Sequence, residues 1–464
     1  MLYELLRGTA AIALRWYYAD IAVQGRERVP SDGPLLVVAN HPNALIDPLL
    51  VGTTLPRRVL LTAKATLFEH SALAVLLRSV GVVPLRRAKD EPHDRGSITV
   101  VPERNAGAFG QVTAALRAHQ AVLVFPEGIS HDDSTLAPLK SGAARMALQA
   151  NRDGIARIRL LPMGLVFEEK ERPGSRVLVR IGDSLDLDEW IAQQSAEPQE
   201  LMQALEARLR GVTLNFASSE RAARAVHLAR VLVALTAAPA PVGEPESLAE
   251  QAAIALRIDA TTSALTNAAP RLIQAADALV SRLDAIEREL RHRGIRLADV
   301  RISTRLPDAV AFVAREGPLA LLGGVAIVLG WLTHWIPLRA ARALAVRSLS
   351  RDASRDQPAM RTILFGLTAT VLWYIAQLVV LTRIAGPLVA VGWLAVTFSA
   401  AHALRLGGGR LRRALQRARS FVALRTDPSV QPRLVAAVDA LVVEALALEQ
   451  ALAAQGPTAG LPHS

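Results

Sequence analysis

The chain has 464 residues, no cysteine and a formal net charge of +11, and arginine carries nearly all of the positive charge because lysine occurs only at positions 64, 89, 140 and 170. The lack of cysteine excludes disulfides, zinc–thiolate sites and a cysteine nucleophile. Hydrophobic residues make up 51% of the sequence although only 4% is aromatic, which indicates membrane contact. Basic residues are not interleaved with aromatic ones, so nucleic acid is not expected as a partner.

Residues 1–20 are predicted to form an interfacial amphipathic helix. Glu4, Arg7 and Arg15 fall on one face of such a helix, and apolar residues fall largely on the other. The apolar set is Leu2, Leu5, Leu6, Ala13, Trp16 and Tyr17. Such a helix lies on a membrane surface or packs on the following domain, and both interpretations stay open.

Residues 21–185 are predicted to form an α/β domain with a mixed sheet flanked by helices. Strand-like apolar runs occupy 34–40, 58–64, 79–85, 120–128, 157–167 and 176–182, and helical stretches occupy 71–79, 106–119 and 141–151. This alternation is typical of a sheet with helices on its faces. Functional groups in such folds gather where strands end, so the residues after each strand deserve inspection.

The strand at 34–40 leads into a histidine, and a carboxylate follows six residues later. A histidine held by a carboxylate can take a proton from a hydroxyl near neutral pH, which makes His41 a candidate base and Asp47 its orienting group. No G-x-S-x-G motif supplies a serine, so a substrate hydroxyl, or failing that water, is the expected target. The residues also fit a structural interpretation in which Asp47-Pro48 only begins a helix.

Two further segments follow strand ends, and together with His41 they suit a phosphorylated alcohol. Arg86 and Arg87 could bind a phosphate in bidentate fashion. Glu127 could accept a substrate hydroxyl, and Gly128 lets a backbone N–H approach closely. Lys140 precedes a helix and is counted with the binding residues because lysine is so rare here. No metal site is predicted: the run His131-Asp132-Asp133 is expected to be a solvated loop.

Residues 186–315 have a mostly helical pattern, with a linker predicted near 236–247. A first heptad-like series comprises Leu279, Leu283, Ile286, Leu290 and Leu297. A second series near the C-terminus comprises Leu434, Val438, Leu441, Ala445, Leu448 and Leu452. The two series could pair with each other, form a homo-oligomer, or each pack on its own domain.

Residues 316–405 are predicted to be the membrane region. The segments 362–382 and 384–404 each contain 21 residues without charge, enough to cross a hydrocarbon core of about 30 Å, and Gly386-Pro387 favours a tight hairpin between them. The segment 318–338 is expected to be re-entrant or interfacial. The stretches 339–361 and 405–425 carry six and seven arginines, so both are expected on the cytosolic side. Residues 406–464 are predicted to form a basic segment and a C-terminal helix.

Four segments together resemble the glycerolipid acyltransferase family. They are NHPNALID at 40–47, GVVPLRR at 81–87, FPEGISHD at 125–132 and LLPMGLVF at 160–167, and the resemblance covers roughly residues 1–185. It implies that His41 is a general base oriented by Asp47. It also implies that Arg87, Glu127 and Gly128 bind glycerol phosphate and that Pro162 lines the acyl-donor side. The segment 211–230 and the late hairpin resemble a long membrane-bound subgroup of that family.

One spacing departs from the family pattern, because five residues separate His41 from Asp47 where four are usual. On a regular helix the two spacings would point the carboxylate about 100° apart. A turn or bulge is therefore expected between them if the two side chains meet, with Asn43 as a candidate for an additional hydrogen bond.

The resemblance implies acyl transfer from acyl-CoA or acyl carrier protein to glycerol-3-phosphate at a cytoplasmic membrane, with the catalytic domain in the cytosol. Alternative acceptors are lysophosphatidate and other lysophospholipids, and the alternative from another class is a non-catalytic membrane tether. Without a cysteine or a marked serine, a ternary complex is expected and no acyl-enzyme. No cofactor is expected beyond the acyl donor, which is a co-substrate.

Overall fold

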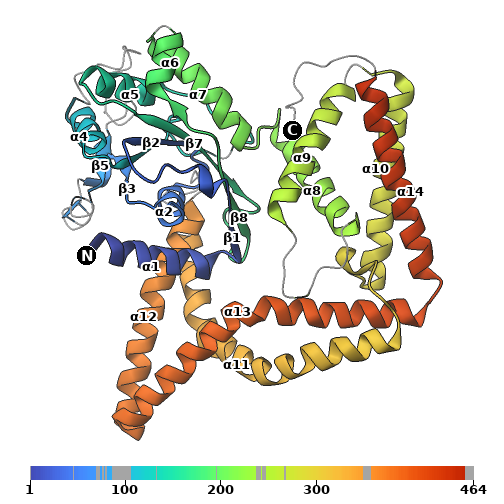
Figure 1. Ribbon diagram of the computed structural model, residues 1–464. Coiled ribbons are helices and arrows are strands. Elements are labelled where there is room, and N and C mark those ends of the chain that lie inside the picture. The colour runs from blue at the N-terminus through green and yellow to red at the C-terminus, as the bar shows by residue number, and fades with distance from the viewer. Residues whose placement is uncertain are drawn as a thin grey trace. The chain divides into compact units, whose positions relative to one another are not determined.

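A computed structural model describes residues 2–44, 46–68, 74–75, 78, 81–85, 106–131, 133–194, 196–236, 242, 247–265, 268–348 and 357–454 (Figure 1). The chain forms two compact units. The first comprises Met1–Asn215 and Ala341–Leu367, and the second comprises Phe216–Ala340 and Thr368–Ser464. The predicted helix at 71–79 and the predicted linker near 236–247 lie largely outside the described residues.

The first unit is built on a seven-stranded mixed sheet. Its strands are β1 (Asp20–Gln24), β2 (Leu35–Ala39), β3 (Val59–Leu60), β6 (Ala121–Val124), β7 (Arg159–Phe167), β8 (Arg176–Ile181) and β9 (Leu185–Asp186). They lie in the order β1-β8-β7-β2-β6-β3, with β9 beside β7. Strand β2 runs parallel to both β6 and β7, whereas β7 and β8 are antiparallel. Strands β4 (Thr62–Lys64) and β5 (Val83–Leu85) form a small parallel sheet.

Helices cover both faces of this sheet because successive residues of a buried strand point to opposite sides. In β2, Leu36 and Val38 pack on one side with α4 (Ala106–Arg117), α5 (Gly142–Arg152), α6 (Leu187–Gln193) and α7 (Pro198–Val212). Leu35 and Val37 pack on the other side with α1 (Leu2–Tyr17) and α2 (Ile46–Thr54). Short 3₁₀ turns lie at Arg26–Arg28 and Ala65–Phe68. The predicted α/β class with a mixed sheet flanked by helices is confirmed.

This unit extends beyond the predicted boundary at residue 185. Leu187, Leu201 and Leu205 are fully buried on the sheet face that α4 and α5 also cover. Because α6 and α7 complete that layer, the compact unit ends at Asn215. The boundary at 185 is therefore wrong: a helical pattern distinguishes helix from strand, but it does not show which core a helix covers.

The two faces of helix α1 are not divided into a charged exposed face and an apolar buried face. Arg7 points at the protein, where its guanidinium donates to the Gly52 and Leu55 carbonyls at 2.9 and 2.6 Å. Leu14 and Tyr17 are buried. Leu5 and Ile12, by contrast, are 66% and 61% exposed. The helix thus packs on α2 and still presents apolar side chains to its surroundings, and its contact with a membrane stays a prediction.

The second unit is helical. Its elements are α8 (Ser219–Thr236), α9 (Leu248–Leu265), α10 (Pro270–Arg293), a 3₁₀ turn (Leu297–Asp299), α13 (Pro387–Thr426), α14 (Val430–Ala453), and most of α11 (Leu306–Arg347) and α12 (Gln357–Ala385). The two heptad-like series pack against each other. Leu283 and Leu290 of α10 share one core with Leu434 and Leu441 of α14. These residues are buried within one chain, so we do not propose an oligomer through them.

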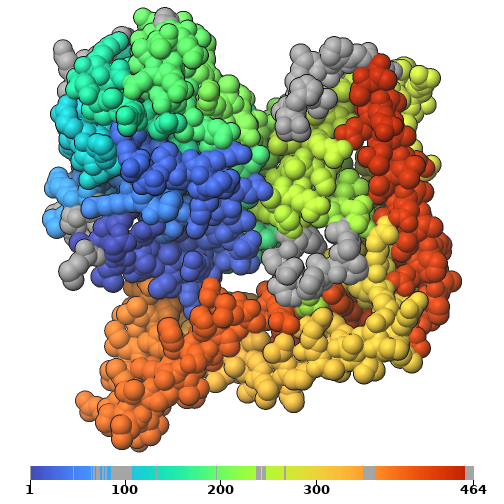
Figure 2. Space-filling view, in the orientation of Figure 1, coloured from blue at the N-terminus to red at the C-terminus, as the bar shows by residue number. Residues whose placement is uncertain are grey.

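Three helices among the described residues are long and apolar enough to cross a membrane. They are Leu306–Arg347, Arg361–Ala385 and Pro387–Thr426. A single residue, Gly386 with φ +90°, separates the second from the third, as the predicted hairpin requires. The segment 318–338 lies within one continuous helix, α11. Side chains of α12 and the first half of α13 form much of the orange surface in Figure 2.

Candidate functional site

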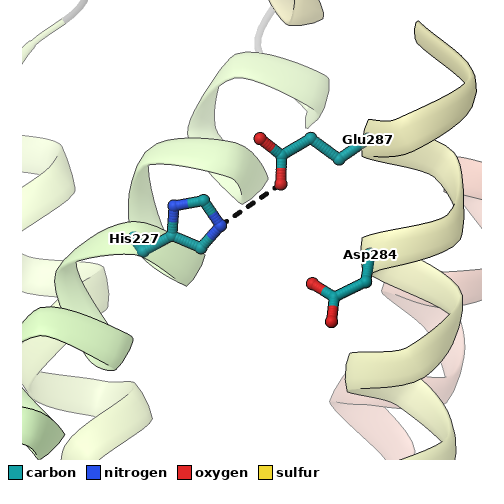
Figure 3. A group of neighbouring side chains, drawn as sticks. All are labelled: His227, Asp284 and Glu287. Atoms are coloured by element: carbon teal, nitrogen blue, oxygen red, sulfur yellow. Dashed lines mark ion pairs between the residues drawn. The ribbon is translucent and has the colours of Figure 1, made fainter. Parts of the chain in front are cut away.

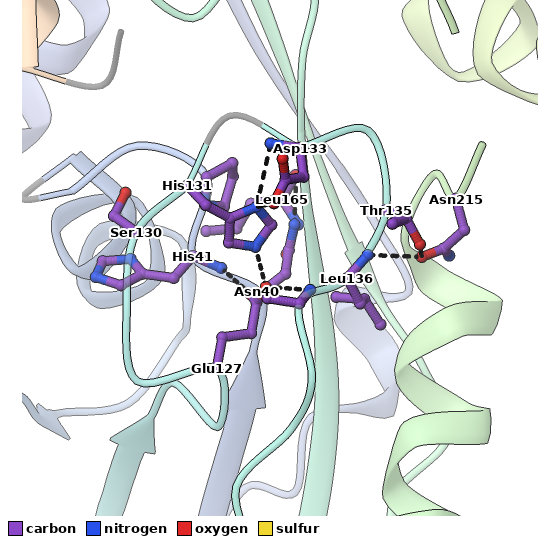
Figure 4. A network of polar contacts seen from close by, with 12 residues as sticks. Asn40, His41, Glu127, Ser130, His131, Asp133, Thr135, Leu136, Leu165 and Asn215 are labelled. Atoms are coloured by element: carbon purple, nitrogen blue, oxygen red, sulfur yellow. Dashed lines mark hydrogen bonds and ion pairs between the residues drawn. The ribbon is translucent and has the colours of Figure 1, made fainter. Parts of the chain in front are cut away.

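The site is formed where β2 and β6 end. These strands are parallel neighbours, with Val38 paired to Val124, so the segments that follow them emerge at the same edge of the sheet. One segment carries Asn40 and His41, and the other carries Glu127 and the loop to residue 140. The Asn40 amide exchanges two hydrogen bonds with the Leu165 backbone, at 2.7 and 3.1 Å, and fixes the first segment to β7 (Figure 4).

His41 and Asp47 meet despite their unusual spacing. Nδ1 of His41 lies 2.9 Å from Oδ2 of Asp47. The chain between them is a turn, with Ala44 at φ +39° and Ile46 N–H bonded to the Asn43 carbonyl at 2.9 Å. The Asn43 backbone N–H also donates to Oδ2 of Asp47 at 2.7 Å. The predicted turn is confirmed, and α2 begins at Ile46, so Asp47 lies inside the first turn of the helix rather than capping it.

The ring of His41 is held on one side and open on the other. It stacks on Phe125, with ring centroids 3.9 Å apart and an interplanar angle of 12°. Nε2 has no hydrogen bond to the described residues. An imidazole whose Nδ1 proton is held by a carboxylate presents Nε2 as a proton acceptor, so this geometry suits a base acting on an external hydroxyl.

Asp47 occupies an environment that disfavours its charge. The side chain is fully buried, and burial raises the pKa of the carboxyl above its usual value, although the hydrogen bond from His41 opposes this shift. Its Oδ1 atom has no hydrogen-bond partner among the described residues. A buried acceptor without a partner costs stability, and such groups are concentrated at functional sites. The position is therefore difficult to explain as a structural helix start.

Glu127 does not present a carboxylate to a substrate. The residue is 1% exposed; Oε1 accepts the His41 backbone N–H at 2.7 Å, and Oε2 accepts the Ala137 N–H at 2.9 Å. His131 Nε2 also contacts Oε2 (Figure 4). The expectation that Glu127 holds a substrate hydroxyl is corrected, because both oxygens are already engaged by protein donors.

Gly128 and Lys140 lie together beside Glu127. Gly128 has φ +68°, and a Cβ atom added there would lie 2.7 Å from Nζ of Lys140. The backbone N–H of Lys140 donates to the Pro126 carbonyl at 2.8 Å, which returns the loop to its origin. Lys140 is exposed. Arg86 and Arg87 lie outside the described residues.

Several residues of the site were not identified from the sequence. Nζ of Lys170 donates to the carbonyls of Pro42 and His131, at 2.7 and 3.1 Å. The side-chain amide of Asn43 donates to the hydroxyl of Tyr18 at 3.1 Å. His131 was expected in a solvated loop, but its side chain is only 12% exposed. Lys170 and Tyr18 carry no local signal, because strands β7 and β1 bring them to the site from distant parts of the chain.

Two other features share no residue with this site. A surface hollow of about 740 Å³ is lined by parts of α4, α5 and α7, and none of the residues discussed above lines it. On α8 and α10, His227, Asp284 and Glu287 offer potential metal ligands (Figure 3). Glu287 is already paired with His227 at 3.2 Å and with Arg291 at 2.7 Å, which accounts for its low exposure. We assign no role to either feature.

Comparisons with known proteins identify acyltransferases as relatives of this chain. A sequence model of the family described as "Acyltransferase" matches residues 20–166. The chain is 22% identical over 266 residues to an uncharacterized acyltransferase of Schizosaccharomyces pombe, covering 40% of this chain and 39% of that protein. It is 27% identical over 120 residues to glycerol-3-phosphate O-acyltransferase 1 of Saccharomyces cerevisiae, covering 24% and 16%. The chain thus spans less than half the length of these curated relatives.

A solved structure also matches. The 1-acyl-sn-glycerophosphate acyltransferase PlsC of Thermotoga maritima aligns with 45% of this chain and 78% of its own, at 21% identity and a TM-score of 0.35, which is too low to support the assignment. The family match and the sequence relatives define an acyltransferase domain over residues 20–166. This part of the chain is therefore similar to glycerolipid acyltransferases.

Proposed function

We propose that this protein transfers a fatty acyl group from acyl-CoA or acyl carrier protein to a hydroxyl of glycerol-3-phosphate, with His41 as the general base. The supporting observation is the His41–Asp47 pair, which is buried at the end of a central strand while Nε2 of the histidine stays open. The name of the Saccharomyces cerevisiae relative favours glycerol-3-phosphate over other acceptors.

The proposed reaction has one addition and one elimination. Nε2 of His41 takes the proton of the acceptor hydroxyl while its oxygen forms a bond to the thioester carbonyl carbon. Asp47 stabilises the resulting imidazolium. The tetrahedral intermediate then expels the thiolate as the carbon–sulfur bond breaks, and the thiolate takes the proton from His41. The products are an ester and a free thiol, and no acyl-enzyme is formed.

Positive charge near the strand ends would hold the acceptor's phosphate. Lys140 is exposed beside Gly128, and Arg87 follows the segment that contains β5. Phosphate binding at these residues would bring the acceptor hydroxyl to His41, and holding two reactants in place replaces much of the entropy cost of their encounter. A lysophosphatidate acceptor carries the same phosphate, so it is the second candidate.

The test is acyl transfer by the purified full chain in liposomes, comparing wild type with His41→Ala. Labelled acyl-CoA and acyl carrier protein are each offered with glycerol-3-phosphate or lysophosphatidate. We expect glycerol-3-phosphate to be acylated and the rate to fall at least about 1,000-fold in the variant. Incorporation only into lysophosphatidate would identify lysophosphatidate as the acceptor in place of glycerol-3-phosphate. Folded wild-type protein that acylates neither acceptor would contradict the proposal and favour a membrane tether.

We also propose that the chain crosses the membrane an even number of times, through α12 and the first part of α13. Segments before α11 and after α13 share one core: Leu283 and Leu290 pack with Leu434 and Leu441. Segments that pack together lie on the same side of a bilayer, so the three apolar helices between them cannot all cross. The arginine-rich stretches on both sides of the hairpin support a cytosolic position for that side.

Contacts within the second unit favour α11 as the helix that does not cross. His334 Nε2 lies 2.8 Å from the Tyr374 hydroxyl, and Trp373 donates to the Thr333 carbonyl at 2.9 Å. Tyr374 precedes Gly386 by twelve residues, so the hairpin tip at Gly386 extends about 18 Å beyond the contact between Tyr374 and His334. In this arrangement Thr333 and His334 of α11 lie about halfway into a hydrocarbon core of about 30 Å.

Cysteine labelling tests this arrangement without background, because the natural chain has no cysteine. Single changes Ser303→Cys, Ser348→Cys, Ala385→Cys and Ser429→Cys are treated with a membrane-impermeant maleimide in spheroplasts and in inside-out vesicles. We expect Ala385→Cys to be labelled from the outer side and the other three from the cytosolic side. Opposite sides for residues 303 and 429 would overturn the even number of crossings. Opposite sides for 303 and 348 would make α11 a crossing helix.

A further inference from the structure

Glu127 is a buried carboxylate that the proposed reaction steps do not consume. Burying a carboxylate is costly unless it is hydrogen-bonded and its charge is compensated. Two of its donors are the backbone N–H groups of His41 and Ala137, and the third is the imidazole of His131 (Figure 4). His131 is therefore the titratable side chain in contact with this carboxylate, and it can supply the compensating charge.

His131 is attached to the catalytic segment by a second route. Its backbone carbonyl accepts a hydrogen bond from Nζ of Lys170 at 3.1 Å, and the same ammonium donates to the Pro42 carbonyl at 2.7 Å. On the side away from Glu127, Nδ1 of the neutral His131 ring accepts the Asp133 backbone N–H, with 3.2 Å between the nitrogens, and Oδ2 of Asp133 lies 3.4 Å from Nδ1, where it can accept from the protonated ring. The imidazole is thus fixed between the loop after β6 and the segment after β2.

These contacts fix the backbone of the turn between His41 and Asp47. Glu127 accepts the N–H of His41, Lys170 binds the carbonyl of Pro42, and Ser130 Oγ accepts the Ala44 N–H at 2.9 Å. Asp47 and Phe125 orient the ring of His41, but the position of the ring depends on the backbone that carries it. A displacement of about 1 Å in a catalytic group can cost about 100-fold in rate.

We propose that His131 is a positioning residue for acyl transfer: through Glu127 it fixes the backbone of His41, and its positive charge strengthens this support. The inference rests on the proposed function, because the effect is read out through acyl transfer. It assigns Glu127 to the support of the base and leaves phosphate binding to other residues.

The groups around His131 set the direction of its titration. The hydrogen bond to Glu127 raises the pKa of the imidazole, burial opposes this, the carboxylates of Glu127 and Asp133 add to it, and Lys170 lowers it. In both charge states Nε2–H can donate to Glu127. The charge-dependent part of the support is complete below the usual histidine pKa of about 6.5 and is lost as the pH rises through the raised value.

The test compares His131→Gln and His131→Leu with wild type, with His119→Asn as the matched control. His119 lies before β6, at the opposite end of that strand, and tolerates a positive φ as asparagine does. Each protein is measured as the full chain in liposomes for kcat, for KM of glycerol-3-phosphate or whichever acceptor the wild type uses, and for its melting temperature. The kcat ratio of wild type to His131→Gln is followed from pH 6 to pH 9.

We expect His131→Leu to lower kcat about 10- to 100-fold with KM nearly unchanged, as removal of an outer supporting partner does elsewhere. His131→Gln can still donate to Glu127 and should recover most of kcat, and the wild-type to His131→Gln ratio should fall severalfold as the pH rises. A rise in KM at constant kcat, or no recovery with glutamine, would overturn the inference. A ratio independent of pH would overturn its charge component. Inactive wild type would instead refute the proposed function.

Discussion

The two units of this protein bury different kinds of groups. In the acyltransferase unit, His41, Asn43, Asp47 and Glu127 are all less than 10% exposed and lie within a few residues of two strand ends. In the helical unit, the core between α10 and α14 is formed by leucine, isoleucine and valine, and the buried carboxylates of Asp299 and Glu316 are each paired with an arginine. Buried polar groups cost stability, so their concentration in one place indicates function there, whereas the apolar core indicates support.

The largest effect on activity is expected from Asp47→Asn. An asparagine amide donating to Nδ1 would leave the proton on Nε2, so kcat should fall by about 10³- to 10⁴-fold. Stability at pH 7 should not decrease, because the raised pKa of Asp47 means that its ionised form is disfavoured in the folded state. That penalty is absent below the usual aspartate range and grows as the pH rises. Thermal unfolding of both proteins at pH 5 and pH 7 would check this, and a large loss of stability would contradict it.

The next largest effect is expected on the stability of the helical unit. Leu434 is 2% exposed in the core between α10 and α14, so Leu434→Ala should lower the free energy of unfolding by about 2–5 kcal/mol. Leu446 on the same helix is 49% exposed and serves as the matched control, with an expected change within about 0.5 kcal/mol. Denaturant unfolding measures both. A lower kcat per folded molecule in Leu434→Ala would contradict the assignment of a purely supporting role to the helical unit.

A smaller effect is expected at Gly128. Its φ of +68° should make Gly128→Ala cost about 1–2 kcal/mol, and the added Cβ would displace the Lys140 side chain and raise KM for the acceptor. Gly174 has φ +82° with nothing within 4 Å of an added Cβ, so Gly174→Ala carries the same backbone strain without that contact. Kinetics of both variants separate the two causes. Equal KM values would remove Lys140 from acceptor binding.

The smallest effect is expected for a surface ion pair of the helical unit. Arg282 and Glu444 lie 2.6 Å apart, but their side chains are 58% and 45% exposed. Exposed pairs contribute about 0–1 kcal/mol and are screened by salt. Glu444→Gln, Arg282→Gln and the double variant should give a coupling energy in this range that declines at high salt. A coupling well above it would show that surface charge also holds the helical unit together.

Local patterns sufficed for most of the fold and for the central pair of the site. The strands rich in β-branched residues and leucine were predicted because a strand that is buried on both faces contains few polar residues. His41 and Gly128 were identified because they follow such strands, and Lys140 was identified because lysine is rare in this chain. Glu127 was placed correctly and given the wrong role, since the sequence shows which side chain follows a strand but not which donors surround it.

The sequence by itself determined the α/β class, the hairpin at Gly386 and the histidine at the strand end, because each depends on short-range periodicity, charge or turn residues. Tertiary structure alone decided that α6 and α7 belong to the sheet, that α10 and α14 pack together, and that His131 and Lys170 surround the base. These contacts join residues far apart in the chain, and a one-dimensional pattern does not specify which buried surfaces meet.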